Sequence, residues 1–154
     1  MAIVKFPLAE EPTTSCNSAS VDSRALYNFF PADAVDGNVG SRWESEANDP
    51  EWIYVELAAD TTVTHVQLVW ETAYSSTFEI QTCPLNCDDG GDPDTWAWTT
   101  AYGPQTRTLS GFPNYELLTM TSQPTDTRFV RMLGTARATG WGHSLWELEV
   151  YSVP

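Results

Sequence analysis

The chain has 154 residues, of which 42% are hydrophobic, 12% aromatic and 18% charged. This composition is typical of a globular protein and excludes a disordered chain, and no stretch approaches the roughly 18 consecutive apolar residues of a membrane-spanning helix. The 21 acidic residues against 7 basic ones give a formal net charge of −14, which disfavours nucleic acids and anionic membranes as partners. We expect one domain over residues 1–154, with residues 1–17 as an N-terminal extension.

Alternating apolar and polar residues, the pattern of a half-buried β-strand, recur along the chain. The clearest case is 52–57, where Ile53, Val55 and Leu57 fall on one face and Tyr54 falls on the other. We expect further strands at 62–70, 77–82, 96–100, 115–121, 128–133 and 145–151. No uninterrupted window of 11 or more residues keeps the apolar period of a helix. Many short strands without helical spacers predict an all-β fold, an antiparallel sandwich or barrel.

Three long loops interrupt this pattern, at about 16–50, 83–94 and 134–143. Binding residues of sandwiches usually sit in such loops, because the sheets hold the loops rigid. Seven tryptophans are more than the core of so short a chain needs. We therefore expect some of them to be exposed, where they could form a platform for a flat ligand.

The cysteines leave their redox state open. Cys83 and Cys87 are close enough in sequence to close a small disulfide loop, and two reduced thiols are the alternative. Cys16 is then left over. The segment that follows Met1 is too short and polar for a signal peptide, so either a signal has been removed or the protein is not secreted.

Several segments taken together, in chain order, resemble one known family. They are 34–38 with 41–45, then 50–57, 70–74, 134–137 and 141–151. In this order they resemble the discoidin (coagulation-factor type C) fold and, within it, the family 32 carbohydrate-binding modules, over roughly residues 18–151. The resemblance implies a jelly-roll-like antiparallel β-sandwich, also described as galactose-binding-domain-like, with the ligand loops at one end.

Oxygen-bearing residues gather around a turn in the first loop. Asp36, Asn38 and Ser41 place oxygens around Gly37, and Glu147 on the last predicted strand could add a second carboxylate. Ca²⁺ takes 6–8 oxygen ligands, so this set suits it. The resemblance implies a structural Ca²⁺ ion held by the backbone carbonyls of Asp33, Asn38, Ser41 and Trp146 and by the side chains of Asp36, Ser41 and Glu147. The alternative is an Asx turn at Asp36 with a solvent-facing Glu147.

A second ion is one interpretation of the acidic stretch 88–94, and a solvated turn is the interpretation that we favour.

A sugar site needs an aromatic face and a few fixed polar groups. Trp141 lies between two glycines in the last loop, and Glu71 follows a predicted strand, where its carboxylate could bind hydroxyls or an ammonium group. The resemblance implies that Glu71, Arg42 and Trp141 face the sugar, and that an acid of the first loop maps to Asp22. Arg137 in the last loop completes the set of candidate ligand-binding residues.

Three of these residues have structural alternatives. Trp141 could belong to the core. Arg42 could form an ion pair with Glu44 or Glu71. Arg137 is better suited to bracing the last loop against a carboxylate than to touching a ligand.

No catalytic constellation is recognisable, since neither His65 nor His143 has an identifiable nucleophile as partner. We therefore expect a non-catalytic module that binds exposed or terminal sugars of a polysaccharide of the chitosan (glucosamine), β-glucan or galactose type. It would be secreted or extracellular and would hold an attached or partner catalytic domain near its substrate. The alternative is a discoidin-type adhesion or structural subunit that binds protein.

Overall fold

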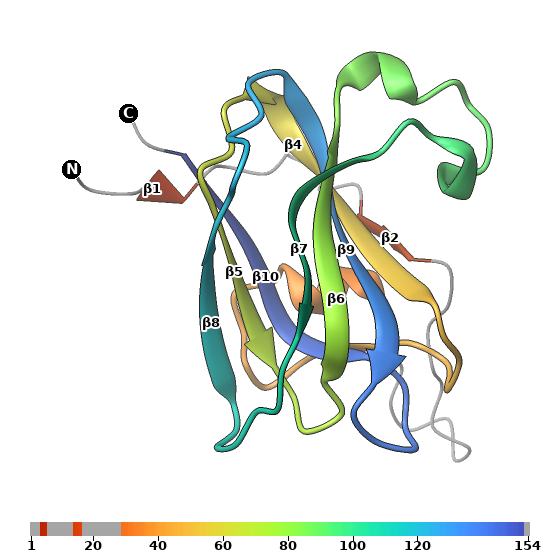
Figure 1. Ribbon diagram of the computed structural model, residues 1–154, viewed down its shortest axis with the longest axis vertical. Coiled ribbons are helices and arrows are strands. Elements are labelled where there is room, and N and C mark those ends of the chain that lie inside the picture. Colours follow the sequence, from red (N-terminus) through yellow and green to blue (C-terminus); the bar gives the residue numbers. More distant parts are fainter. Residues whose placement is uncertain (1–3, 6–13, 17–28, 153–154) are drawn as a thin grey trace.

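The computed structural model describes residues 4–5, 14–16 and 29–152 (Figure 1). Asp22, the predicted acid of the first loop, lies outside the described residues. Within the expected extension of residues 1–17, two short segments pair with strands of the main body, β1 with β10 and β2 with β4. No helix among the described residues is long and apolar enough to cross a membrane.

Two antiparallel sheets pack face to face (Figure 1). The first contains, in spatial order, β1 (Val4–Lys5), β10 (Ser144–Ser152), β5 (His65–Trp70) and β8 (Asn114–Thr119), and β3 (Trp43–Glu44) also pairs with β10. The second contains, in spatial order, β2 (Thr14–Cys16), β4 (Glu51–Thr61), β9 (Thr127–Arg137), β6 (Ser75–Cys83) and β7 (Thr99–Thr106). Short 3₁₀ helices are η1 (Pro31–Ala34), η2 (Leu85–Cys87) and η3 (Pro93–Thr95). The predicted antiparallel β-sandwich is confirmed.

Each of the predicted strands exists, and two of them begin later than expected. The strand expected at 62–70 begins only at His65. The strand expected at 96–100 begins only at Thr99, because Trp96 follows η3 and packs on the outer face of the second sheet instead of extending β7. β1, β2 and β3 have only two or three residues each, so no alternation announces them in the sequence.

The core lies between the sheets and follows the predicted faces. Ile53, Val55 and Leu57 of β4 are completely buried there. Tyr54, on the opposite face of β4, is also buried, although a solvent-facing position was the simplest expectation. It belongs to a second aromatic cluster on the outer face of the second sheet, together with Trp52, Trp96 and Phe129.

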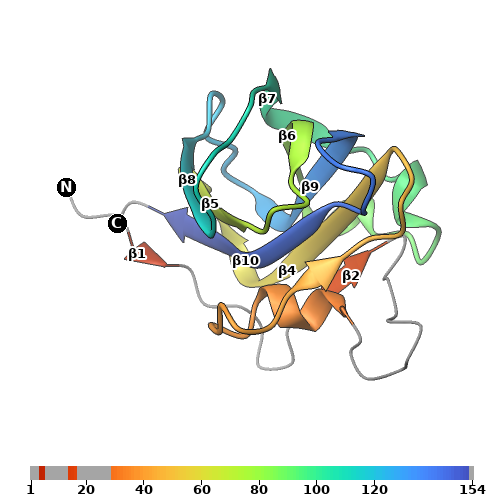
Figure 2. The same cartoon turned by 90° about the horizontal axis from the view of Figure 1, so that it is seen from below.

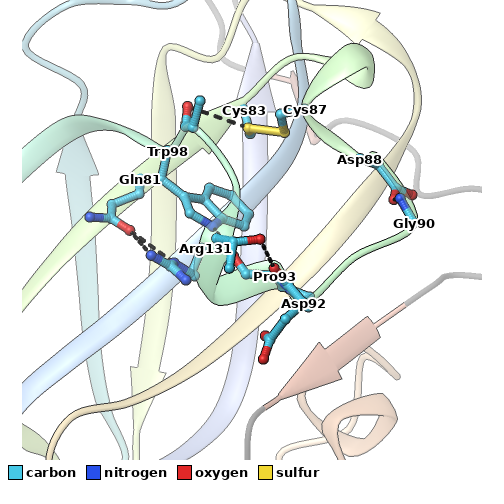
Figure 3. Close-up of a disulfide and its surroundings, with 11 residues drawn as sticks. Gln81, Cys83, Cys87, Asp88, Gly90, Asp92, Pro93, Trp98 and Arg131 are labelled. Atoms are coloured by element: carbon cyan, nitrogen blue, oxygen red, sulfur yellow. Dashed lines mark hydrogen bonds between the residues drawn. A yellow bond between two sulfur atoms is a disulfide. The ribbon is translucent and has the colours of Figure 1, made fainter.

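This second cluster is held by the segment between β6 and β7. The structure joins Cys83 and Cys87 in a disulfide at the start of that segment, so the disulfide alternative is the one that the structure contains (Figure 3). The Trp52 indole donates a hydrogen bond to the Asp94 carboxylate at 2.6 Å. Ring stacking and this polar contact together make the 83–98 segment a cover for the sheet.

Candidate functional site

The loops predicted to carry ligand residues meet at one end of the sandwich. The loops between β5 and β6, between β9 and β10, and before β4 lie together at the lower end in Figure 1, and Figure 2 views this end directly. Backbone hydrogen bonds join the first two loops, because the Ala138 amide donates to the Tyr74 carbonyl at 3.0 Å and the Ser144 amide donates to the Ala73 carbonyl at 2.8 Å. The segment between β6 and β7, which begins at the disulfide, lies at the opposite end of the sandwich (Figure 1).

Trp141 lies at the open tip of the β9–β10 loop. It is 72% exposed, more than any other large hydrophobic side chain among the described residues. Its backbone amide donates to the Thr139 hydroxyl at 3.1 Å. The core alternative for Trp141 is therefore wrong, and its indole face is available to a ligand. That a sugar stacks on this face remains a prediction.

Arg42 is surrounded by partners at the same end. Its guanidinium forms an ion pair with Glu44, donates to the Ser144 hydroxyl at 2.8 Å and lies 4.1 Å from the centre of the Phe29 ring. The Glu71 carboxylate is 3.9 Å from the same Arg42 nitrogen. Arg42 thus makes the ion pairs of its structural alternative, and contact with a sugar remains a prediction.

Glu71 caps the turn that follows β5. Its Oε2 accepts a hydrogen bond from the Ala73 amide at 2.8 Å, and its own amide donates to the Ser144 carbonyl at 3.3 Å. These bonds fix the carboxylate at the rim of the loop end, where its half-buried side chain keeps access to solvent. A fixed carboxylate at a rim can accept hydrogen bonds from hydroxyls or pair with an ammonium group.

Arg137 makes the bracing contacts weighed from the sequence. Its Nε lies 3.2 Å from Asp49 Oδ2, and its Nη1 donates to the Trp141 carbonyl at 3.4 Å. The carboxylate that braces the loop is Asp49, which no pattern in the sequence singles out. A direct contact between Arg137 and a ligand remains a prediction.

His143 has partners that sequence analysis missed. Its Nε2 lies 2.7 Å from Asp49 Oδ1, and its Nδ1 lies 2.7 Å from the Ser75 hydroxyl. The order serine, histidine, aspartate resembles a hydrolase triad, yet Ser75 and His143 are both 0% exposed, so no substrate reaches the hydroxyl in this structure. Burial lowers the pKa of His143, although the hydrogen bond to Asp49 acts in the opposite direction. We interpret this row of hydrogen-bonded side chains as structural.

The first-loop turn forms the Asx turn that was the alternative to a metal site, and it gathers oxygens. The Asn38 amide donates to Asp36 Oδ1 at 2.8 Å, and the Ser41 hydroxyl donates to Asp36 Oδ2 at 2.5 Å. Asp33 lies in η1, where its carboxylate accepts from the Phe30 amide at 3.1 Å. In the part of the chain that the structure describes, no group of three or more His, Cys, Asp or Glu side chains is arranged to hold a metal ion.

Glu147 does not face solvent. The alternative to a metal site, in which it was solvent-facing, is wrong on this point. It is 3% exposed, on β10, after an irregularity in the pairing of β10 with β5 that begins at Leu145. β10 also packs against η1, and Trp146 beside Glu147 is only partly exposed. A buried carboxylate is a ligand type that suits a hard cation.

The acidic stretch 88–94 is a set of local turns. Asp88 Oδ1 accepts from the Gly90 amide at 2.9 Å, and Asp92 Oδ1 accepts from the Asp94 amide at 3.0 Å. These bonds are those of Asx turns, which agrees with the interpretation as a solvated acidic turn.

Arg131 stabilises the end of the molecule that carries the disulfide. Its guanidinium donates to Gln81 at 2.8 Å, lies 3.5 Å from Asp94 and stands 4.4 Å from the centre of the Trp98 ring (Figure 3). Burial lowers its pKa to about 10, while the charges of Asp94 and Glu79 act in the opposite direction. Arg131 is therefore still protonated at neutral pH, and its contacts hold the 83–98 segment on the sheet.

Comparison with known proteins agrees with this architecture. The family model described as "F5/8 type C domain" matches residues 14–148. The chain belongs to the F5/8 type C domain family. No curated protein matches it.

Solved structures similar to this F5/8 type C domain include two modules of one enzyme. Chitosan-binding module 1 of a chitosanase/glucanase from Paenibacillus sp. IK-5 is 36% identical with a TM-score of 0.74, and the match covers 97% of this chain and 99% of that one. Chitosan-binding module 2 of the same enzyme, in complex with chitotriose, is 34% identical with a TM-score of 0.74, covering 91% of this chain and 95% of that one.

A more distant structure shares the fold. The family 32 carbohydrate-binding module of NanJ from C. perfringens, in complex with galactose, is 18% identical with a TM-score of 0.72, covering 98% of this chain and 100% of that one. The resemblance to discoidin domains and family 32 modules stated from the sequence motifs is thus confirmed.

Proposed function

We propose that this F5/8 type C domain is a non-catalytic carbohydrate-binding module for chitosan-type polysaccharides, which carry free amino groups. The observation that carries the proposal is the 72% exposed Trp141 at the loop end of a chain that is 36% identical to a chitosan-binding module. An exposed indole offers the flat apolar face on which a sugar ring stacks, and rigid loops around it limit the entropy lost on binding.

Charge favours an amino sugar over a neutral one. The formal net charge of −14 creates a field that attracts a polycation such as chitosan. Glu71 sits at the rim beside Arg42, which is already paired with Glu44, so two carboxylates share the single positive charge of Arg42. An ammonium group of glucosamine can pair with Glu71, whereas galactose or a β-glucan offers only hydroxyls.

The module would act together with an enzyme. The chitosan-binding modules that it resembles derive from a chitosanase/glucanase, so a catalytic domain on the same chain or in a partner is the natural associate. Binding of the module raises the effective concentration of such a domain at its substrate. This role requires an extracellular location, because the polysaccharide is outside the cell.

A structural Ca²⁺ ion belongs to this proposal. Asp36, Asn38, Ser41 and the backbone of Asp33 would hold it on one side and Glu147 on the other, tying the first loop to β10. Saturation at about 100 times the dissociation constant would stabilise the fold by about 2.7 kcal/mol. Chelation of calcium should lower the melting temperature of the wild type and leave that of Glu147→Gln unchanged; equal melting with and without chelator in the wild type would contradict the site.

Calorimetric titration tests the sugar. The wild type is titrated with glucosamine oligosaccharides, with their N-acetylated counterparts and with galactose. We expect the glucosamine series to bind most tightly, and Glu71→Gln to weaken it by roughly tenfold or more, because a charged hydrogen bond contributes about 1.5–3 kcal/mol. Glu46→Gln removes the same charge from an exposed position in the neighbouring loop and serves as the control. Equal affinity for the N-acetylated series would overturn the preference for amino groups.

A further inference from the structure

One carboxylate contacts both ends of the loop that carries Trp141. Asp49, in the loop that leads into β4, lies with Oδ1 2.7 Å from His143 Nε2 and with Oδ2 3.2 Å from Arg137 Nε. Arg137 ends β9 and His143 immediately precedes β10, so the two residues bracket the loop. Asp49 thus links Arg137 and His143, which lie six positions apart at the two ends of the same loop.

The His143 end of this bridge is anchored in the fold. Because a carboxylate only accepts, His143 Nε2 carries the hydrogen that faces Asp49, and in the neutral ring Nδ1 accepts from Ser75, 2.7 Å away on β6. The His143 amide donates to the Ser45 hydroxyl at 2.9 Å, and the Ser45 amide donates to the His143 carbonyl at 2.9 Å. A Cβ added to Gly134 would lie 2.4 Å from His143 Nδ1, so the ring packs directly against the backbone of β9.

The Arg137 end reaches the tip of the loop. Arg137 Nη1 donates to the Trp141 carbonyl at 3.4 Å, so the guanidinium spans from Asp49 to the backbone of the exposed tryptophan. The Trp141 side chain itself is 72% exposed and therefore receives little order from packing. Order at the tip comes instead from the loop's backbone and polar contacts. They include the Ala138 amide on the Tyr74 carbonyl, the close packing of Gly142 on Ser45 and the Thr139 hydroxyl, besides the contacts of Arg137 and His143.

We propose that Asp49 is the positioning residue of the sugar platform: its two carboxylate oxygens hold His143 and Arg137 at once and thereby present the Trp141 indole in one orientation. This inference rests on the proposed function for its effect on affinity. Asp49 itself need not touch the sugar, since both oxygens are engaged by the loop. Fixing the indole before binding removes an entropy loss that a mobile loop would suffer on meeting the ligand.

The test compares two carboxylates in the same loop. Asp49→Ala and Glu46→Ala each remove one negative charge, and the two positions lie within four residues of one another. An effect of net charge on binding should therefore be the same in both variants. We expect Asp49→Ala to weaken binding of a glucosamine oligosaccharide by roughly 3- to 10-fold, the range expected for ordering one side chain. Glu46→Ala should change affinity by less than about twofold.

A second measurement is made without sugar. Amide hydrogen exchange of residues 139–142 reports the order of the loop, and we expect it to be roughly tenfold or more faster in Asp49→Ala than in the wild type and unchanged in Glu46→Ala. Asp49→Asn keeps an oxygen that accepts from His143 but loses the charge that pairs with Arg137. It should give an intermediate result, and it replaces Asp49→Ala if that variant does not fold.

The outcomes separate the two proposals. Weaker binding with unchanged loop exchange would overturn the positioning role and make Asp49 a direct contact. Equal losses of affinity in the Asp49 and Glu46 variants would overturn the positioning role and attribute the loss to net charge. If the wild type binds no glucosamine oligosaccharide, the proposed function fails, while unchanged exchange of residues 139–142 in the Asp49 variants would still refute the positioning role.

Discussion

Truncation of Trp141 to alanine is the perturbation whose size follows most directly from the structure. A full indole side chain presents roughly 250 Å², and Trp141 is 72% exposed, which leaves about 180 Å² open. A sugar that stacks on one face covers about half of this, or about 90 Å². At about 25 cal/mol per Å² the lost burial is about 2 kcal/mol, or about 30-fold in the dissociation constant. The covered remainder of the side chain is about 70 Å², so the free energy of unfolding should fall by no more than about 2 kcal/mol.

Calorimetry with a glucosamine oligosaccharide and urea unfolding measure the two quantities separately. Leu85→Ala is the matched control, because Leu85 is 51% exposed at the end that carries the disulfide and is far from the site. Its affinity should equal that of the wild type. Undiminished affinity in Trp141→Ala would refute the indole platform, and a large loss of stability in that variant would refute the argument from its exposure.

Three further predictions concern the framework. Replacing Cys83 and Cys87 by serine should lower the free energy of unfolding in urea by about 2 kcal/mol, because a loop of about five residues is released, while sugar affinity stays the same; a weakened affinity would contradict the separation of the two ends. Gly142→Ala should destabilise the fold strongly, because its Cβ would lie 2.0 Å from a backbone oxygen, whereas Gly140→Ala, with nothing within 4 Å, should not; equal melting temperatures would refute this. Burial lowers the pKa of His143 in the folded chain from its ordinary 6.5. As the pH falls, the imidazole of the unfolded chain is therefore protonated before that of the folded chain. The stability that His143 contributes above about pH 6.5 should be lost as the pH falls through the pKa of the folded chain. His143→Gln should remove that part of the pH dependence, and an unchanged slope in the variant would contradict it.

The sequence was enough to predict the longer strands because their residues alternate locally. The alternation in β4 predicts both the strand and its core face, on which Ile53, Val55 and Leu57 are buried. It could not predict that Tyr54 is covered, because the cover comes from the 83–98 segment, which returns to the sheet through the packing of Trp96 and the disulfide. The alternation of apolar and polar residues describes one strand at a time and does not indicate which segments pack on the outer side of that strand.

The site divides in the same way. The glycines around Trp141 predict its exposure from neighbouring residues alone. The contact of Asp49 with His143 joins residues 94 positions apart, and that of Ser75 with His143 joins residues 68 apart, so only the folded chain reveals them. Glu147 illustrates a further limit, since it is 3% exposed and follows a break in the pairing of β10 with β5. Such breaks have no signature in the alternation of polar and apolar residues.

The most direct test of the central claim is NMR mapping of the wild type during titration with a glucosamine oligosaccharide. We expect the amide and indole signals of loops 71–74 and 138–143, Trp141 first among them, to shift progressively with ligand. Signals of the 83–98 segment at the other end should stay in place. Shifts confined to that other end, or none at millimolar ligand, would contradict the claim that this F5/8 type C domain binds amino sugars through its Trp141 loop.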